Sequence, residues 1–313
     1  MKKGSSFLNN DLLASNPMLI TAMAIFFIVF LRLAWVGDDT YITLRTVDNF
    51  IYGRGLTWNP GERVQVYTHP LWMFLLSGSY FFIRNAYFAT IILSLVISMV
   101  GLIVLAKYYQ ANLLDLLIVL LPLLLSKSFM DFSVSGLENP FTHLFVILFY
   151  LRFFSCDLDS LKQRFLLGFL ASLAVFNRMD TLLIFAPPLA FLLFKYHQPK
   201  YTGQLISSFF SFILWEIFAI FYYGFPFPNT AYAKLNTGIS NLLFLKQGVI
   251  YILDSINRDP ITLAVIGLGV VLSFANGNLR GKLAAYMGGV SAISPEMPHQ
   301  VILKHFNLAK TTS

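Results

Sequence analysis

The chain has 313 residues, of which 57% are hydrophobic and only 12% are charged, and its mean hydropathy is +0.69. Soluble globular domains are about 45–50% apolar and about 25% charged, so this composition excludes a water-facing globule, a disordered chain, a coiled coil and an ordinary nucleic-acid-binding domain. Basic loops beside a membrane explain the net charge of +7 better than a polyanionic partner does, and an integral membrane protein is predicted.

The first apolar stretch, 17–36, has the length of about 20 residues that spans a bilayer as a helix. Lys2 and Lys3 precede it and no small-residue cleavage site follows, so it is predicted to be an uncleaved anchor. The next segment, 37–70, breaks the apolar pattern with acidic and basic residues and with several glycines and prolines that form turns. We expect it to be a loop outside the membrane.

Further apolar stretches follow at 71–83, 86–106, 113–126, 141–155, 165–176, 180–194, 205–223 and 261–275. Several are shorter than a full span, so helix ends are expected to extend into flanking polar residues. Between 70 and 127 the alternation of sides requires two crossings although three stretches are present, so 71–83 or 113–126 is expected to be partial. The sequence thus predicts an all-α, polytopic transmembrane bundle of about eight crossings.

Basic residues assign the two sides of this bundle, because cytoplasmic loops are enriched in Lys and Arg. The residues that mark the cytoplasmic side are Lys2, Lys3, Arg152, Lys162, Arg164, Lys195, Lys200, Arg280 and Lys282. The segments 37–70, 127–140, 177–180 and 224–260 then lie on the opposite side, where acidic and basic residues occur together. This mixture favours an active site on that side.

The sharpest motif is the pair Asp38 and Asp39, directly after the first span. Two adjacent carboxylates raise one another's pKa, and a nearby cation lowers it. A carboxylate held there can act as a general base on a hydroxyl or help to hold a metal ion. The alternative is that the two acids cap a helix in a solvated loop.

The candidate cations are Arg178, Lys234, Arg45 and His69, of which the last two lie in the first outward segment. Arg178 interrupts two apolar runs, where a charge is costly, although it can also form an ion pair with Asp180 or an ordinary polar turn. Lys234 follows a loop stiffened by prolines and suits a phosphate contact, or else it anchors the interface. His69 is more often the polar start of a helix than a catalyst. Glu138 is the second acid, with helix capping as its alternative.

Several collinear motifs resemble the GT-C glycosyltransferases, and within them the bacterial arabinofuranosyltransferase branch. Those of the first extracytoplasmic loop are Gly37-Asp38-Asp39-Thr40-Tyr41-Ile42, Arg45, Gly53-x-Gly55-Leu56-x-Trp58-Asn59-Pro60-Gly61-Glu62-Arg63-Val64 and Tyr67-Thr68-x-Pro70-Leu71-Trp72. Those that follow are Ser135-Gly136-Leu137-Glu138, Asn177-Arg178-x-Asp180 and Pro228-Asn229-Thr230-x-Tyr232-Ala233-Lys234. The resemblance covers about residues 17–275.

The resemblance implies a multi-pass enzyme of the bacterial inner membrane whose active-site loops face the extracytoplasmic side. It implies transfer of arabinofuranose, or of another pentose or hexose, from a polyprenyl-phosphate donor to a cell-envelope glycan or surface protein. The base would be Asp38 or Asp39. Residues expected to bind the donor phosphate or the substrates are Arg45, His69, Glu138, Arg178, Asp180, Tyr232 and Lys234.

No cofactor is predicted with certainty, and a divalent cation is left open. The single cysteine, Cys156, excludes a disulfide framework and a multi-cysteine metal site. Nucleic acid is not an expected partner.

Residues 1–275 are expected to form the GT-C-like module. The polar tail 276–313 loses the apolar pattern and suggests truncation or a frameshift. Two alternatives stay open: a transporter or lipid flippase, which also needs many helices and intramembrane charge, and a non-catalytic truncated remnant.

Overall fold

The computed structural model describes residues 17–108, 120–235 and 240–275, and within these ranges it contains helices and no strand. The predicted all-α class is therefore confirmed for this part of the chain. The structure divides into two compact units, 1–262 and 263–313. The expected change of character after residue 275 concerns residues outside the described ranges and stays a prediction.

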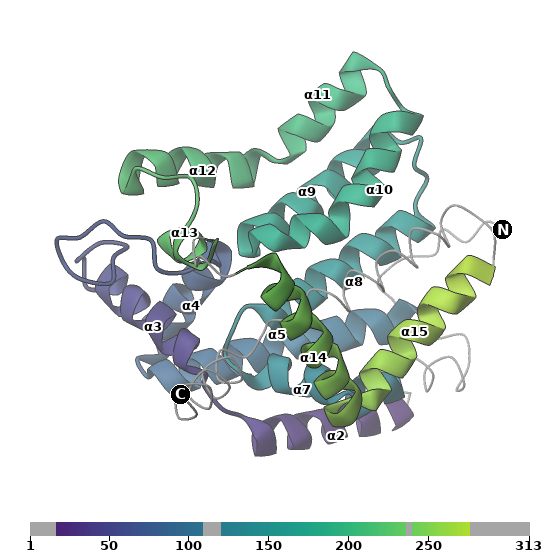
Figure 1. Ribbon diagram of the computed structural model, residues 1–313, viewed down its shortest axis with the longest axis horizontal. Helices are drawn as coiled ribbons and strands as arrows, with labels where there is room; N and C mark the ends of the chain where they lie inside the picture. Colours follow the sequence, from purple (N-terminus) through teal and green to yellow (C-terminus); the bar gives the residue numbers. More distant parts are fainter. Residues whose placement is uncertain (1–16, 109–119, 236–239, 276–313) are drawn as a thin grey trace. The chain divides into compact units, whose positions relative to one another are not determined.

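The first unit holds the following helices, shown in Figure 1: α2 (Pro17–Leu33), α3 (Asp38–Ile51), α4 (Pro70–Ile83), α5 (Ala86–Tyr108), α7 (Lys127–Val134), α8 (Asn139–Ser155), α9 (Leu161–Asn177), the 3-10 helix η1 (Met179–Thr181), α10 (Leu182–Lys195), α11 (Pro199–Ser208), α12 (Phe210–Tyr223), α13 (Asn229–Leu235) and α14 (Asn241–Arg258). Helix α15 (Pro260–Ala275) begins at its end.

Most predicted apolar stretches coincide with helices, and the differences have physical causes. The stretch 205–223 is divided at Phe209 into α11 and α12. Helix α3 lies in the segment expected to be a loop. Leu44, Val47 and Ile51 recur at helical spacing, but the charged residues around them interrupt the continuous apolar run that marks most of the other helices. The stretch 113–126 lies mostly outside the described residues.

Two buried clusters hold the first unit together. One joins α3, α4, α5, α8 and α12, and it includes Leu56 and Tyr67 from the loop between α3 and α4. The other joins α2, α5 and α7 around Phe26, Phe30 and Met130. Helices α5, α8, α9 and α10 lie side by side in this order (Figure 1), each in contact with the next. The loop after α3 is thus built into the core.

The end of α12 fastens this loop through two tyrosines. The hydroxyl of Tyr223 donates to the carbonyl of Leu56 at 2.8 Å and lies 2.9 Å from the hydroxyl of Tyr67, which must therefore be the donor of that second bond. Burial, followed by the neighbouring Tyr223, raises the pKa of Tyr67 well above its ordinary value. The neighbouring Tyr222 hydroxyl accepts from the backbone N–H of Leu56 at 3.2 Å. These neutral bonds fix the loop on α12.

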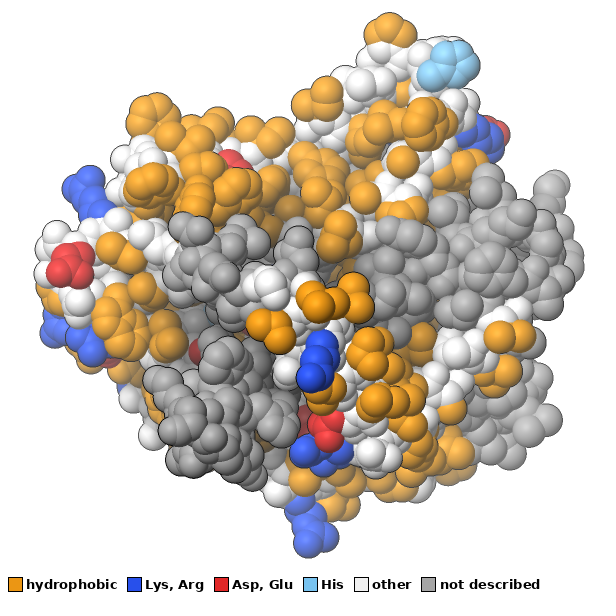
Figure 2. Space-filling view, in the orientation of Figure 1, with side chains coloured by type: hydrophobic (Ala, Val, Ile, Leu, Met, Phe, Trp, Pro, Cys, Tyr) orange, Lys and Arg blue, Asp and Glu red, His pale blue; other side chains and the backbone are white. Residues whose placement is uncertain are grey.

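Among the described helices, α5 is long and apolar enough to cross a membrane by itself. Two further spans are counted if α2 with α3, bent by 88°, and α11 with α12, bent by 59°, each make one crossing. About eight crossings are therefore not confirmed and stay a prediction. Exposed apolar side chains cover much of the face in Figure 2, and those of α12 are Phe210, Ile213, Leu214, Ile217, Ile220 and Phe221.

Helices α9 and α11 approach most closely at Gly168. A Cβ there would lie 2.0 Å from Ser208 Oγ and 2.9 Å from Ser208 Cβ, so rotation of the serine cannot relieve the clash. We predict that Gly168→Ala lowers the free energy of unfolding by about 1–3 kcal/mol through overpacking. Thermal unfolding of the detergent-purified protein measures this effect.

The control is Gly203→Ala on α11, where an added Cβ meets no atom within 4 Å. This variant should be as stable as the wild type or slightly more stable, because alanine favours helix. Equal unfolding temperatures for the two variants would contradict the close approach of α9 and α11.

Candidate functional site

The start of α3 is bonded to the turn between α7 and α8. The backbone N–H of Gly37 donates to the carbonyl of Ser135 at 3.0 Å, and the Thr40 hydroxyl donates to the same carbonyl at 3.1 Å. The indole N–H of Trp72, in α4, donates to the carbonyl of Gly136 at 3.1 Å. These three bonds bring together the motifs that begin at Gly37, Tyr67 and Ser135, which are far apart in the chain.

This turn requires glycine at position 136. Its φ of +81° is a left-handed conformation that side chains rarely adopt, and a Cβ would lie 2.7 Å from Thr90 Cγ2 and 3.1 Å from Thr40 Cγ2. The chain therefore passes between α3 and α5 only because position 136 has no side chain. Glu138 follows two residues later, and its direction is set by this turn.

Glu138 is the centre of a buried ion network. Its side chain is 2% exposed, with Oε1 2.9 Å from Arg178 Nη1 and Oε2 3.0 Å from His69 Nδ1. Burial opposes its ionisation, but attraction to His69 and then Arg178 outweighs burial and holds the pKa of Glu138 below its ordinary value. The site thus contains a carboxylate that stays charged.

Arg178 connects Glu138 with Asp180. Its Nε lies 2.8 Å from Asp180 Oδ1 and 2.9 Å from Oδ2, and its side chain is 25% exposed against 48% for Asp180. Burial lowers the pKa of Arg178, but Glu138 and then Asp180 outweigh this effect and raise it. The Arg178–Asp180 ion pair considered from the sequence is present, and the same guanidinium also forms an ion pair with the buried carboxylate of Glu138.

His69 extends the network to α3. It precedes α4, and its Nε2 lies 2.7 Å from the hydroxyl of Thr43. Thr43 lies one helical turn after Asp39 and its hydroxyl is 3.5 Å from the Asp39 carbonyl. The side chains of Asp39 and Thr43 therefore lie on the same face of α3. The network runs from α3 to the break between α9 and α10.

Asn177 ties that break to the start of α8. Its side-chain amide donates to the Glu138 carbonyl at 3.2 Å and to the Thr142 hydroxyl at 3.0 Å. Sequence reasoning named neither Asn177 nor Thr43 as a site residue. Asn177 could have been found from its place in the Asn177-Arg178-x-Asp180 motif, whereas a threonine within a helix gives no comparable signal.

Asp38 and Asp39 lie in the first turn of α3, and both are exposed. Asp38 Oδ1 accepts a hydrogen bond from the backbone N–H of Asp39 at 3.1 Å. Gly37 is the N-cap residue of α3 and no side chain caps the helix, so the two acids do not act as caps, although their negative charge is favourable at this end of a helix. Within the described ranges neither carboxylate forms an ion pair, and both are open to solvent next to the network.

The remaining predicted residues lie outside the network. Arg45 donates to the Trp58 carbonyl at 3.1 Å and to Asn59 Oδ1 at 3.2 Å, and its guanidinium carbon is 4.5 Å from the Trp58 ring centroid. Arg45 therefore holds the loop after α3. Tyr232, on α13, is 45% exposed. Lys234 belongs to the same helix, but its side chain lies outside the described residues.

Helix α13 nevertheless lies beside the first loop, because the backbone N–H of Asn229 donates to the Gln65 carbonyl at 3.1 Å. Three or more His, Cys, Asp or Glu side chains do not gather into a metal-binding group anywhere in the part of the chain that the structure describes. Glu138 and Asp180 are both engaged by Arg178. The site is thus defined by paired carboxylates beside a buried ion network.

Curated proteins similar to this chain include two named terminal beta-(1->2)-arabinofuranosyltransferase. The protein from Mycobacterium tuberculosis is 29% identical in an alignment of 284 positions that covers 82% of this chain and 44% of that protein. The protein from Corynebacterium glutamicum is 37% identical over 73 residues, which are 23% of this chain and 11% of that protein. The chain spans less than half the length of these relatives.

No family model and no solved structure matches the chain. The similarity to the two curated proteins confirms the resemblance to the arabinofuranosyltransferases that the sequence motifs indicate. The roles of the individual site residues stay predictions.

The buried carboxylate of Glu138 makes stability depend on pH. Since its folded-state pKa is below the ordinary 4.5, the unfolded chain binds the proton first as the pH falls, and stability is lost below about pH 4.5. We predict that Glu138→Gln lowers the free energy of unfolding at neutral pH by about 3–5 kcal/mol, because Arg178 loses a buried ionic partner and His69 loses its contact with a carboxylate. It should also lose less stability on acidification than the wild type does.

Thermal unfolding from about pH 6 to about pH 3.5 tests this dependence. Glu62→Gln is the control, since Glu62 is exposed in the first loop and should leave the pH profile unchanged. Parallel profiles for the wild type and Glu138→Gln would show that Glu138 does not contribute.

We predict that Gly136→Ala destabilises the protein by about 1–3 kcal/mol more than Gly61→Ala does. Both glycines have a positive φ, +81° and +93°, so the backbone strain is similar. Only at Gly136 would the Cβ clash, whereas at Gly61 it meets nothing within 4 Å. Equal unfolding midpoints in denaturant would argue against the tight passage of this turn.

Proposed function

We propose that this chain contains the active-site part of a GT-C-type membrane glycosyltransferase. It transfers arabinofuranose, or another pentose or hexose, from a polyprenyl-phosphate donor to a cell-envelope glycan or surface protein. The observation that carries the proposal is the position of the exposed Asp39 one helical turn before Thr43, whose hydroxyl contacts His69 of the buried ion network. The similarity to arabinofuranosyltransferases over 82% of the chain supports the choice of sugar.

The chemistry needs a base on one side of the sugar and positive charge on the other. The acceptor oxygen forms a bond to the anomeric carbon while the bond from that carbon to the phosphate oxygen breaks, and the electron pair leaves with the phosphate. The proton of the acceptor hydroxyl goes to Asp38 or Asp39, whose exposed carboxylates are free to receive it. Cations near the leaving phosphate stabilise its charge.

The network is proposed to position this base. Thr43 and Asp39 share one face of α3, and Thr43 contacts His69, which is fixed by Glu138. Arg178 is already held by two carboxylates, so its partly exposed edge offers a directed and immobile cation to the donor phosphate. Lys234 is the second proposed cation, from a helix beside the first loop.

We further propose that the first loop faces the extracytoplasmic side of the bacterial inner membrane. Helices α9 and α10 are consecutive, in contact and joined by η1, so their far ends lie together. Those ends carry Lys162 and Lys195, whereas Arg178, directly before η1, and Asp180, within it, belong to the network. This separation of basic residues from the network supports the topology expected from loop charges.

We predict that Asp38→Asn or Asp39→Asn lowers the rate of sugar transfer by about 100-fold or more, because an amide cannot accept the proton. The measurement is consumption of polyprenyl-phosphate pentose by the full chain in lipid, with an arabinan oligosaccharide as acceptor. Glu62→Gln, which removes one charge from the same loop, should keep the wild-type rate. Wild-type rates in both aspartate variants would exclude these residues as the base.

The proposed function itself is tested with the folded wild-type chain and several polyprenyl-phosphate sugars. Donor consumed and sugar found on the acceptor supports it. No donor consumed with any acceptor overturns it, and movement of the lipid-linked sugar across a liposome without transfer would instead indicate a flippase. Cysteine labelling at positions 39 and 234 tests the geometry separately, because labelling from opposite sides would exclude a shared site.

A further inference from the structure

A second buried cation lies at the other end of α9. Arg164 is 6% exposed, and its Nη1 donates to the carbonyl of Leu158 at 3.1 Å. Its Nε and Nη2 are buried and have no hydrogen-bond partner, and no carboxylate pairs with it within the described ranges. A buried guanidinium without an anion is costly, so this arrangement differs from that of Arg178.

Two tyrosine rings surround the guanidinium. Their centroids lie 4.1 Å (Tyr196) and 4.0 Å (Tyr201) from the guanidinium carbon, and the two rings are inclined at 75° to one another. Aromatic faces stabilise a cation but carry no net charge. The unpartnered Nε and Nη2 are adjacent donors on one side of the guanidinium, the geometry that binds two oxygens of a phosphate or carboxylate.

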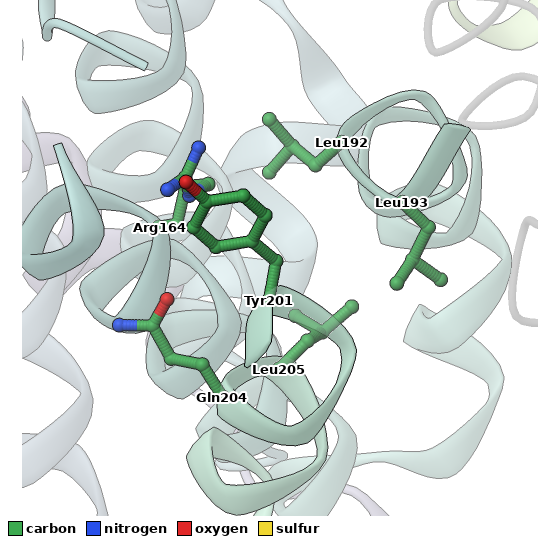
Figure 3. Close-up of a pocket in the computed structure, with 6 residues that line it drawn as sticks. All are labelled: Arg164, Leu192, Leu193, Tyr201, Gln204 and Leu205. Atoms are coloured by element: carbon green, nitrogen blue, oxygen red, sulfur yellow. The ribbon is translucent and has the colours of Figure 1, made fainter. Parts of the chain in front are cut away.

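A small pocket lies between Arg164 and residues of α10 and α11. Its lining residues are Arg164, Leu192, Leu193, Tyr201, Gln204 and Leu205. Figure 3 shows Arg164 and Gln204 on one side of the Tyr201 ring and the three leucines on the other. One end of the pocket is therefore polar and cationic, whereas the other is hydrocarbon. A free anion needs only the first of these ends, and a lipid needs both.

The pocket is separate from the candidate active site. Positions 164 and 178 lie on or next to the same helix, about 21 Å apart at 1.5 Å per residue. Exposed charges of both signs lie close in sequence to the start of α9 and the end of α10. The basic residues are Lys162, Lys195 and Lys200, and the acidic residues are Asp157 and Asp159, of which Asp159 accepts a hydrogen bond from Tyr196. The lysines favour an anionic headgroup, because they add positive potential beside a membrane surface.

We propose that Arg164 binds the phosphate of an anionic phospholipid. The phosphodiester oxygens accept hydrogen bonds from Nε and Nη2, and an acyl chain lies against Leu192, Leu193 and Leu205. The lipid reaches the two nitrogens by displacing the side chains of Tyr201 and Gln204 at the pocket. This site is independent of the sugar-transfer reaction, and it binds a structural lipid at the side opposite to the first loop.

The test is retention of lipid by the purified full chain, measured by native mass spectrometry at a fixed lipid-to-protein ratio. Phosphatidylglycerol offers phosphate and acyl chains, diacylglycerol offers chains alone, and inorganic phosphate offers the anion alone. We expect the wild type to retain phosphatidylglycerol, with Arg164→Gln reducing retention about tenfold or more through the loss of charged hydrogen bonds. Arg54→Gln, which removes an exposed charge just after α3, far along the chain from the pocket, should change retention less than twofold.

Leu193→Ala provides a second variant that leaves the guanidinium intact. It should reduce retention of phosphatidylglycerol several-fold by removing part of the apolar wall, so the proposal stays testable if Arg164→Gln does not fold. Equal retention by the wild type and folded Arg164→Gln overturns the proposal. So does equal retention of diacylglycerol, or displacement of the lipid by an equal concentration of inorganic phosphate. None of these outcomes depends on whether the chain transfers sugar.

Discussion

The fold around the site depends on one constraint, the burial of the Glu138 carboxylate. A carboxylate that is 2% exposed is stable in its charged form only if cations approach it closely. Here the cation is Arg178, at the end of α9, and His69, at the start of α4, supplies a second close contact. Three segments distant in the chain must therefore meet before the charge is compensated. Two further residues help to bring these segments together. Gly136 permits the turn before Glu138, and Asn177 bonds the end of α9 to the start of α8.

The local hydrophobic pattern of the sequence predicts many of the helices, but it predicts few of the contacts between residues that are distant in the chain. The apolar runs of α4, α5, α8 and α9 are visible in the sequence because burial in a helical bundle demands them. Helix α3 is not predicted, because its charged residues interrupt the apolar run, although Leu44, Val47 and Ile51 recur at helical spacing. The site residues His69, Glu138, Arg178 and Asp180 could be named one by one as scarce charges in an apolar chain. That they bond to one another could not, since pairing across long sequence separations leaves no local periodicity.

A structural role and a catalytic role of Asp38 and Asp39 are compatible in the structure. Carboxylates in the first turn of α3 stabilise the helix by complementing its dipole, and the same placement keeps them exposed and fixed in direction. A base must be held rigidly to act on a bound hydroxyl. The hydrogen bonds of the first loop to Tyr222 and Tyr223 supply this rigidity from outside α3. A helix start can thus be structural and reactive at once.

Helix α9 carries an arginine near each end, and the two are neutralised differently. At 1.5 Å per residue the helix is about 26 Å long, slightly less than the hydrocarbon thickness of about 30 Å in a typical bilayer. In the proposed orientation, in which α9 crosses the membrane, both guanidinium groups must stay at a polar boundary. The length of α9 therefore sets the distance between the two boundaries beside it. Tilting the helix would draw one arginine into hydrocarbon. The bilayer around this protein is therefore expected to thin locally, which would favour short-chain lipids beside α9.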